Sequence, residues 1–237
     1  MVGTPRGGAP ALASAPVETL PSGTPAHLAR SEGASRGLIV IPDVWGLRPL
    51  FTEMCDDLAA RTGWSVGSFE PFPGRDLPNE GEPDAGPARF AVLPELSDDR
   101  LLGDAVDLAD LTGCDDVGLI GFCMGGMYAL KAASTGRFDR IAAFYGMIRV
   151  PEAWQGPGQG DPLDALDARG STEVMAVVGS VDPYTPTDHV QELRDRGVDV
   201  VHYEGADHGF VHDPTRPSHR ADDAADAWDR VLTFLAG

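Results

Sequence analysis

Runs of apolar residues without alternation recur along the chain, and they predict strands that are covered on both faces. The clearest run is Gly37-Leu-Ile-Val-Ile-Pro42, which ends at a proline. Such runs are typical of parallel sheets, because a strand with one exposed face would alternate apolar and polar residues. The predicted strands cover residues 26–30, 38–41, 64–69, 116–121, 141–145, 174–179 and 198–203.

Segments with helical spacing of apolar residues separate these strands. Pro49 opens one such segment, in which Leu50, Met54 and Leu58 share a face and Gly63 provides the stop. The predicted helices cover residues 50–62, 98–112, 125–134, 187–196 and 222–235. Residues 70–87 hold five prolines and are predicted to be a loop long enough to form a pocket wall or lid, and residues 150–165 are predicted to be mostly loop.

The alternation of strands and helices predicts an α/β fold with a doubly wound, mostly parallel sheet and helices on both faces. We expect a single domain over residues 25–237, preceded by a flexible tail or edge segment over residues 1–24, which is rich in Gly, Pro, Ala and Thr. In such sheets ligands gather at the carboxyl ends of the strands. Residues that directly follow strands are therefore the candidates for chemistry.

Composition and charge narrow the classes of function. The chain has 237 residues, of which 42% are hydrophobic, and its formal net charge is −19. This charge disfavours nucleic acids and anionic membranes as partners. The three cysteines are widely spaced and lack a C-x-x-C motif, so we expect neither a disulfide framework nor a zinc site. A cytoplasmic protein without a cofactor or metal, as a monomer or homodimer, is the expectation.

One motif follows the predicted strand at residues 116–120 and precedes an apolar helix. The residues Gly121-Phe-Cys-Met-Gly125 have the G-x-C-x-G spacing of a nucleophile elbow, a tight strand-to-helix turn that exposes a nucleophile. Glycines two residues to either side avoid collisions in that turn. The amino end of the following helix would favour the thiolate of Cys123. The alternative is a buried structural cysteine in a tight turn.

Two further residues lie just after predicted strands. Asp182 follows the strand at 174–179, and His208 follows the strand at 198–203. Taken alone, each has an ordinary alternative, a turn aspartate and a surface histidine. Together with Cys123 they have the order nucleophile, acid, histidine, which is that of the α/β-hydrolases. A metal site at His208 and His212 is disfavoured, because Gly209 and Pro214 indicate a loop.

The turn after the strand at 38–41 supplies candidates for supporting roles. Asp43 would lie on the same sheet edge as Cys123, where it is either the partner of the thiol in the resting enzyme or a turn-forming residue. The backbone N–H groups of Met124 and Val44 are the candidate donors of an oxyanion hole.

These motifs, together with Gly205-Ala-Asp-His-Gly-Phe210, resemble the dienelactone hydrolase (carboxymethylenebutenolidase) family over nearly all of the chain. The resemblance implies an α/β-hydrolase fold in which Cys123 is the nucleophile, His208 the base and Asp182 the residue that orients the histidine. The family's type enzyme has glutamate in the place of Asp43. It also has serine and arginine near its histidine to bind the lactone's carboxylate.

Those last two places hold Gly209 and His212 here. His212, Arg89 and Trp45 are the candidate substrate-binding residues, and Arg48 and Arg75 are further arginines near the predicted pocket loops.

We therefore predict a cysteine-dependent hydrolase of small carboxylic esters or lactones that forms a thioester acyl-enzyme. A thioesterase or a hydrolase of neutral lactones is an alternative within the enzymes. A thiol redox sensor or a ligand-binding protein with the same fold is an alternative of another class. Such a sensor would need the thiol of Cys123 but has no evident need for Asp182 and His208.

Overall fold

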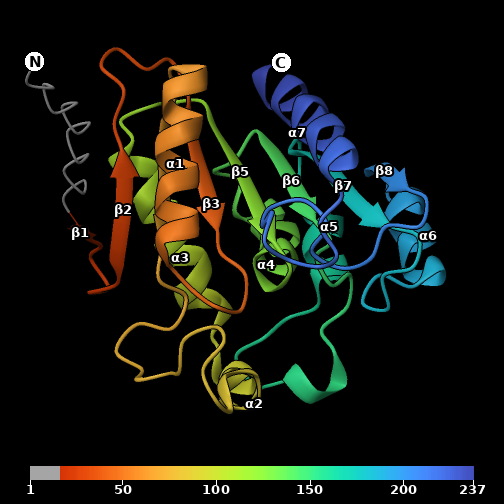
Figure 1. Cartoon of the computed structure of the whole chain (residues 1–237). Coiled ribbons are helices and arrows are strands. Elements are labelled where there is room, and N and C mark those ends of the chain that lie inside the picture. Colours follow the sequence, from red (N-terminus) through yellow and green to blue (C-terminus); the bar gives the residue numbers. More distant parts are fainter. Residues whose placement is uncertain (1–16) are drawn as a thin grey trace, which may run out of the picture.

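The computed structural model describes residues 17–237, which form one eight-stranded sheet with the strand order β1-β2-β4-β3-β5-β6-β7-β8 (Figure 1). The strands are β1 (Val17–Thr19), β2 (Pro25–Ala29), β3 (Gly37–Ile41), β4 (Ser65–Phe69), β5 (Val117–Phe122), β6 (Arg140–Phe144), β7 (Glu173–Gly179) and β8 (Asp199–Tyr203). The strands β3 to β8 pair in parallel, and β1 and β2 are antiparallel additions at one edge. The predicted α/β-hydrolase fold with a mostly parallel sheet is confirmed.

Seven α-helices connect the strands within the described residues. They are α1 (Pro49–Thr62), α2 (Ala85–Val92), α3 (Asp98–Leu111), α4 (Met124–Ala132), α5 (Pro162–Asp167), α6 (Thr187–Asp195) and α7 (Ala221–Ala236). The α1 helix begins at Pro49 and ends at Gly63, whose φ of 73° allows its N–H to bond the carbonyl of Ala59. The helix predictions for residues 50–62, 98–112, 125–134, 187–196 and 222–235 are confirmed to within two residues at each end.

Two segments expected to be loops contain helices. The α2 helix occupies the end of the 70–87 segment, and Pro87 is tolerated because it is the third helical residue, where the N–H has no partner within the helix. The α5 helix begins inside the 150–165 segment with Pro162 as its first residue, and the side chain of Asp161 caps it. Prolines in a first turn are compatible with a helix, so the prolines of these two segments do not exclude α2 and α5.

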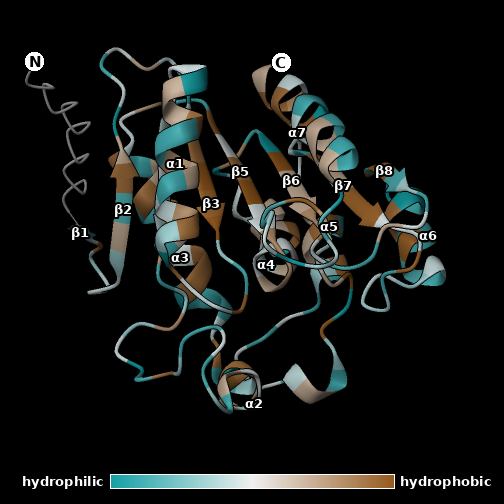
Figure 2. Ribbon diagram, in the orientation of Figure 1, coloured by the Kyte–Doolittle hydropathy of each residue, from teal (hydrophilic) through white to brown (hydrophobic). Residues whose placement is uncertain are grey.

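Helices cover both faces of the sheet. The α1 and α7 helices lie on the face nearer the viewer, while α3 and α4 contact the opposite face (Figure 1). The strands β3 and β7 are mainly brown in Figure 2, whereas α1 and α7 alternate between teal and brown. This contrast follows from burial, because β3 is buried at every residue and β7 at all but its first, whereas α1 and α7 bury only some of their residues.

The predicted tail falls mainly on residues 1–16, which lie outside the described residues. In the remainder of that segment, Glu18 and Thr19 of β1 pair with β2, and Leu20 is buried in the core. No helix between residues 17 and 237 combines the length and the apolar composition that crossing a bilayer requires.

Parallel pairing brings the carboxyl ends of the strands to one edge of the sheet. Ile41 of β3 pairs with Gly121 of β5, and Phe122 pairs with Phe144 of β6. The turns after β3, β5, β6, β7 and β8 therefore meet along this edge, and they carry Asp43, Cys123, Tyr145, Asp182 and His208.

Candidate active site

Cys123 lies in the turn between β5 and α4 with backbone angles that side chains rarely adopt. Its φ is 55° and its ψ is −117°, and it directly precedes the first residue of α4. A Cβ on Gly121 would lie 2.0 Å from the carbonyl oxygen of Gly125, and a Cβ on Gly125 would lie 2.2 Å from that of Ile41. Only glycine fits at either position, so the spacing around the cysteine is a steric requirement of the turn.

The imidazole of His208 is held by Asp182. Nδ1 of His208 lies 2.9 Å from Oδ2 of Asp182, whose side chain is fully buried in the turn after β7. The same carboxylate accepts the backbone N–H of Tyr184, which fixes the turn. The rings of Tyr145 and Tyr184 pack edge-on against His208 at 5.2 and 4.8 Å between centroids. These contacts leave Nε2 as the ring atom available for chemistry.

Cys123 lies close enough to His208 to change its protonation. Burial disfavours the charged imidazole, but the charge of Cys123 and the carboxylate of Asp182 outweigh burial and raise the pKa of His208 to about 10. Nε2 of His208 is buried and makes no hydrogen bond within the described residues. The contact between Nε2 and the sulfur of Cys123 therefore does not have the geometry of a hydrogen bond. We therefore attribute the effect of Cys123 mainly to its charge.

Asp43 is surrounded by cationic and N–H donors. Its oxygens accept from the Trp45 N–H at 3.0 Å, Arg48 at 2.7 and 3.1 Å, Arg216 at 3.0 Å and His212 at 3.0 Å. Burial alone would raise the pKa of Asp43, but His212 and Arg48 hold it well below its usual range. A hydrogen bond from the Cys123 thiol is not among its contacts in the described chain, because the carboxylate is used by other donors, and the bond from the Trp45 N–H is that of a turn-forming aspartate.

His212 is buried, and side chains of the protein contact both of its ring nitrogens. Its Nε2 lies against Asp43, and its Nδ1 is bonded to the hydroxyl of Tyr145. Burial lowers the pKa of His212, so the ring is neutral, with Nε2–H donating to Asp43 and Nδ1 accepting from Tyr145. Both nitrogens are therefore used within the protein, and the role of His212 in binding substrate stays an untested prediction.

The backbone of the turn after β3 is fixed by two side chains from elsewhere. Glu70, just after β4, accepts the N–H groups of Leu47 at 2.9 Å and Phe72 at 2.8 Å. Arg89 of α2 donates to the carbonyl of Val44 at 3.2 Å. The N–H of Met124 is the first of α4, so it has no partner within the helix. Met124 and Val44 stay predicted as the oxyanion donors.

A pocket of about 480 Å³ opens beside this turn. Trp45, Arg48, Glu80 and Arg89 are among the residues that line it. The guanidinium of Arg89 lies 5.7 Å from the centroid of the Trp45 ring and also donates to the carbonyl of Pro78 at 3.0 Å. Trp45 and Arg89 thus line one pocket, and their role in binding substrate stays a prediction.

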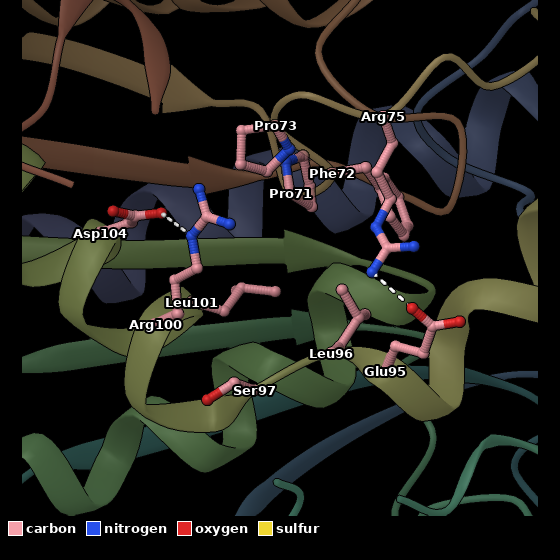
Figure 3. Close-up of a pocket in the computed structure, with 10 residues that line it drawn as sticks. All are labelled: Pro71, Phe72, Pro73, Arg75, Glu95, Leu96, Ser97, Arg100, Leu101 and Asp104. Atoms are coloured by element: carbon pink, nitrogen blue, oxygen red, sulfur yellow. Dashed lines mark hydrogen bonds and ion pairs between the residues drawn. The ribbon is translucent and has the colours of Figure 1, made fainter. Parts of the chain in front are cut away.

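A second, smaller cavity of about 70 Å³ is shown in Figure 3. Arg75 lines this cavity and pairs with Glu95 at 2.8 Å. Arg100 lines it as well and lies 3.9 Å from Asp104, one turn further along α3. This cavity shares Phe72, Pro73 and Arg75 with the larger pocket, and none of its ten lining residues is Cys123, Asp182 or His208. Among residues 17–237, no cluster of three or more His, Cys, Asp and Glu side chains has the arrangement to bind a metal ion.

Comparison with known proteins identifies the family of the chain. Residues 24–237 match the Dienelactone hydrolase family. The chain belongs to this family. It is accordingly a dienelactone hydrolase-like hydrolase of esters or lactones, and the family implies a small lactone substrate.

Individual relatives agree with this assignment. The chain is 29% identical over 231 residues to the Bradyrhizobium protein named "Probable 2-oxo-3-(5-oxofuran-2-ylidene)propanoate lactonase", covering 89% of this chain and 88% of that one. It is 28% identical to Carboxymethylenebutenolidase 2 of Cupriavidus pinatubonensis, covering 78% of each. A crystal structure from Klebsiella pneumoniae subsp. pneumoniae, named "Putative Dienelactone Hydrolase", superposes with a TM-score of 0.77 at 24% identity, covering 90% of this chain and 92% of that one.

In this member of the dienelactone hydrolase family, four residues that the sequence did not indicate lie around the candidate site, namely Tyr145, Glu70, Arg216 and Glu80. Tyr145 and Glu70 directly follow β6 and β4, so the rule of inspecting residues after strands could have found both. Tyr145 has a φ of 39° and is fully buried against His212. Arg216 and Glu80 come from irregular loops, and no local pattern in the sequence indicates that they converge near Asp43.

Proposed function

We propose that Cys123 is the nucleophile of an ester or lactone hydrolase that acts through a thioester. The observation that carries this proposal is the strained backbone of Cys123, whose φ of 55° is maintained at the amino end of α4 beside the His208–Asp182 pair. A strain of this kind costs about 1–3 kcal/mol and persists where the surrounding structure enforces it. A structural cysteine would need neither the strain nor the paired histidine.

In the proposed mechanism the starting state is a thiolate–imidazolium pair, in which His208, whose pKa is raised, holds the proton. The thiolate of Cys123 attacks the carbonyl carbon, and the carbonyl oxygen takes up the negative charge. In the proposed arrangement this oxyanion accepts hydrogen bonds from the N–H groups of Met124 and Val44. The carbon–oxygen bond to the leaving group then breaks, and Nε2 of His208 gives its proton to the departing oxygen.

Hydrolysis of the thioester uses the same histidine as a base. In the thioester the sulfur carries no charge, so the contribution of Cys123 that raised the pKa of His208 disappears. The neutral imidazole can then take a proton from water, whose oxygen attacks the thioester carbonyl. The carbon–sulfur bond breaks and restores the thiolate and the imidazolium, while the acid product leaves.

Asp43 has a structural role in this proposal. With its carboxylate bonded to Arg48, Arg216 and His212, it holds the turn that carries Val44. The resting partner of the sulfur is then His208 and not Asp43. Thiolate leaves readily from a tetrahedral adduct, so substrates with good leaving groups, such as enol lactones and aryl esters, are the best matches.

A substrate panel tests the proposal and its alternatives. Purified protein, C123A and H208A are assayed with an aryl acetate, an enol lactone and an acyl-CoA. We expect the first two substrates to be hydrolysed by the wild type, with losses of at least about 1,000-fold in kcat/KM for either variant. Preference for acyl-CoA would favour a thioesterase. Absence of turnover on all three, with Cys123 readily oxidised, would favour a thiol sensor instead.

A further inference from the structure

Glu80 joins two arginines beside the candidate active site. Its Oε2 lies 3.2 Å from Nη2 of Arg48, and its Oε1 lies 3.1 Å from Nη2 of Arg216. The same two guanidinium groups hold Asp43 from the interior side. Each arginine is therefore placed between a buried carboxylate and the carboxylate of Glu80, which comes from the irregular segment between β4 and α2.

One arginine of the pair, Arg216, lies next to the residue that follows the proposed catalytic histidine. A Cβ on Gly209, the residue after His208, would lie 3.1 Å from Nη1 of Arg216. Arg48 and Glu80 both line the pocket of about 480 Å³ that also contains Trp45 of the turn after β3. A substrate carboxylate that approaches these two guanidiniums would find Glu80 already paired with both.

The other arginines near the pocket are also occupied. Arg89 donates to the carbonyl groups of Pro78 and Val44 and faces the carboxylate of Glu70. Arg75 pairs with Glu95 at the cavity of Figure 3. Among these residues no guanidinium lacks an internal partner. The formal net charge of −19 also repels anions at long range. Long-range electrostatics therefore does not favour the binding of an anionic substrate beside Glu80.

We propose that Glu80 is a specificity-determining residue that makes this enzyme prefer neutral lactones and esters to those that carry a free carboxylate. Glu80 occupies the positions on Arg48 and Arg216 that a substrate carboxylate would otherwise take. A carboxylate on the substrate must either displace Glu80, which loses a charge-assisted hydrogen bond from Arg216 and an ion pair with Arg48, or bind without a counter-ion. This inference rests on the proposed hydrolase function and adds the class of substrate.

Charge-matched substrates and variants test this role. Carboxymethylenebutenolide is assayed as its free carboxylate and as its methyl ester, following the loss of the lactone ring, with each kcat/KM divided by the rate of alkaline ring opening. The variant is E80Q, which keeps the shape and removes the charge. The matched control is E82Q on the same segment, because Glu82 is exposed and bonds only Asn79 within the described residues. An aryl acetate is assayed in parallel.

For the wild type we expect the normalised kcat/KM of the methyl ester to exceed that of the carboxylate by about tenfold or more. E80Q should lower this ratio by about tenfold, through faster hydrolysis of the carboxylate, because both guanidiniums become available. E82Q should leave the ratio unchanged.

Three results would overturn the inference. A wild type that hydrolyses the carboxylate at least as well as the methyl ester would show that the substrate displaces Glu80. An E80Q variant that accelerates both forms equally would show that Glu80 only narrows the pocket. A ratio that E80Q leaves unchanged would show that its charge has no influence. Failure on the aryl acetate and both lactone forms would instead contradict the proposed function itself.

Discussion

The carboxylate of Asp43 lies 3.0 Å from Nε2 of His212, and neither side chain exposes more than 1% of its surface. Two guanidiniums, those of Arg48 and Arg216, complete the neighbourhood of the carboxylate. A buried charge is tolerated only where it is paired and hydrogen-bonded, and each donor here is needed for that purpose. The pair therefore ties the turn after β3 to the loop that carries His208.

D43N is expected to destabilise the protein by about 3–5 kcal/mol, because it leaves two guanidiniums and a buried imidazole without their shared anion. Urea unfolding followed by circular dichroism measures the change. E82Q removes a carboxylate that is exposed, and it should change the free energy of unfolding by less than about 0.5 kcal/mol. Equal stability of D43N and E82Q would show that the network around Asp43 contributes nothing.

G125A is expected to prevent formation of the native turn, or to cost more than about 3 kcal/mol, because its Cβ would lie 2.2 Å from the carbonyl oxygen of Ile41. The matched control is G103A, a helical glycine of α3 whose added Cβ would meet no neighbouring atom within 4 Å, so alanine should stabilise by up to about 1 kcal/mol. Thermal unfolding of both variants is the measurement. A G125A protein as stable as the wild type would contradict the steric account of the elbow.

The pKa of His208 is expected to depend on the sulfur of Cys123. NMR titration of the His208 ring should give a pKa of about 10 in the wild type and a clearly lower pKa in C123A, because only Asp182 then opposes burial. The protonated ring is the proton donor to the leaving group, so kcat/KM should be retained below that pKa and fall as the pH rises through about 10. An unchanged pKa in C123A would show that the two residues do not interact.

The fold could be predicted from sequence because its signals are local. Unalternated apolar runs marked β3 and β5, and Pro49 and Gly63 marked the two ends of α1. The positions of Cys123, Asp182 and His208 on one sheet edge followed from the rule that parallel strands end together. Steric demands of the elbow also show in sequence, because they require glycine at fixed spacing.

The environment of Asp43 could not be predicted in the same way. Its partners Arg216 and His212 lie far along the chain, and Glu80 reaches Arg216 from a segment without regular structure. Pairing between loops depends on the tertiary path of each loop, and no periodicity records it. The sequence therefore singled out Asp43 as either a partner of the thiol or a turn-forming residue, and it gave no signal for the arginines and the histidine that surround its carboxylate.

The most direct test of the nucleophile is to trap the acyl-enzyme. The wild type and C123A are mixed with an aryl acetate, quenched in acid within the first turnovers, and analysed by intact mass and peptide mapping. We expect an acetyl group on Cys123 that neutral hydroxylamine removes, and no adduct with at least about a 1,000-fold loss of kcat/KM in C123A. Acylation of another residue, or C123A with wild-type kcat/KM, would contradict the assignment of Cys123 as the nucleophile.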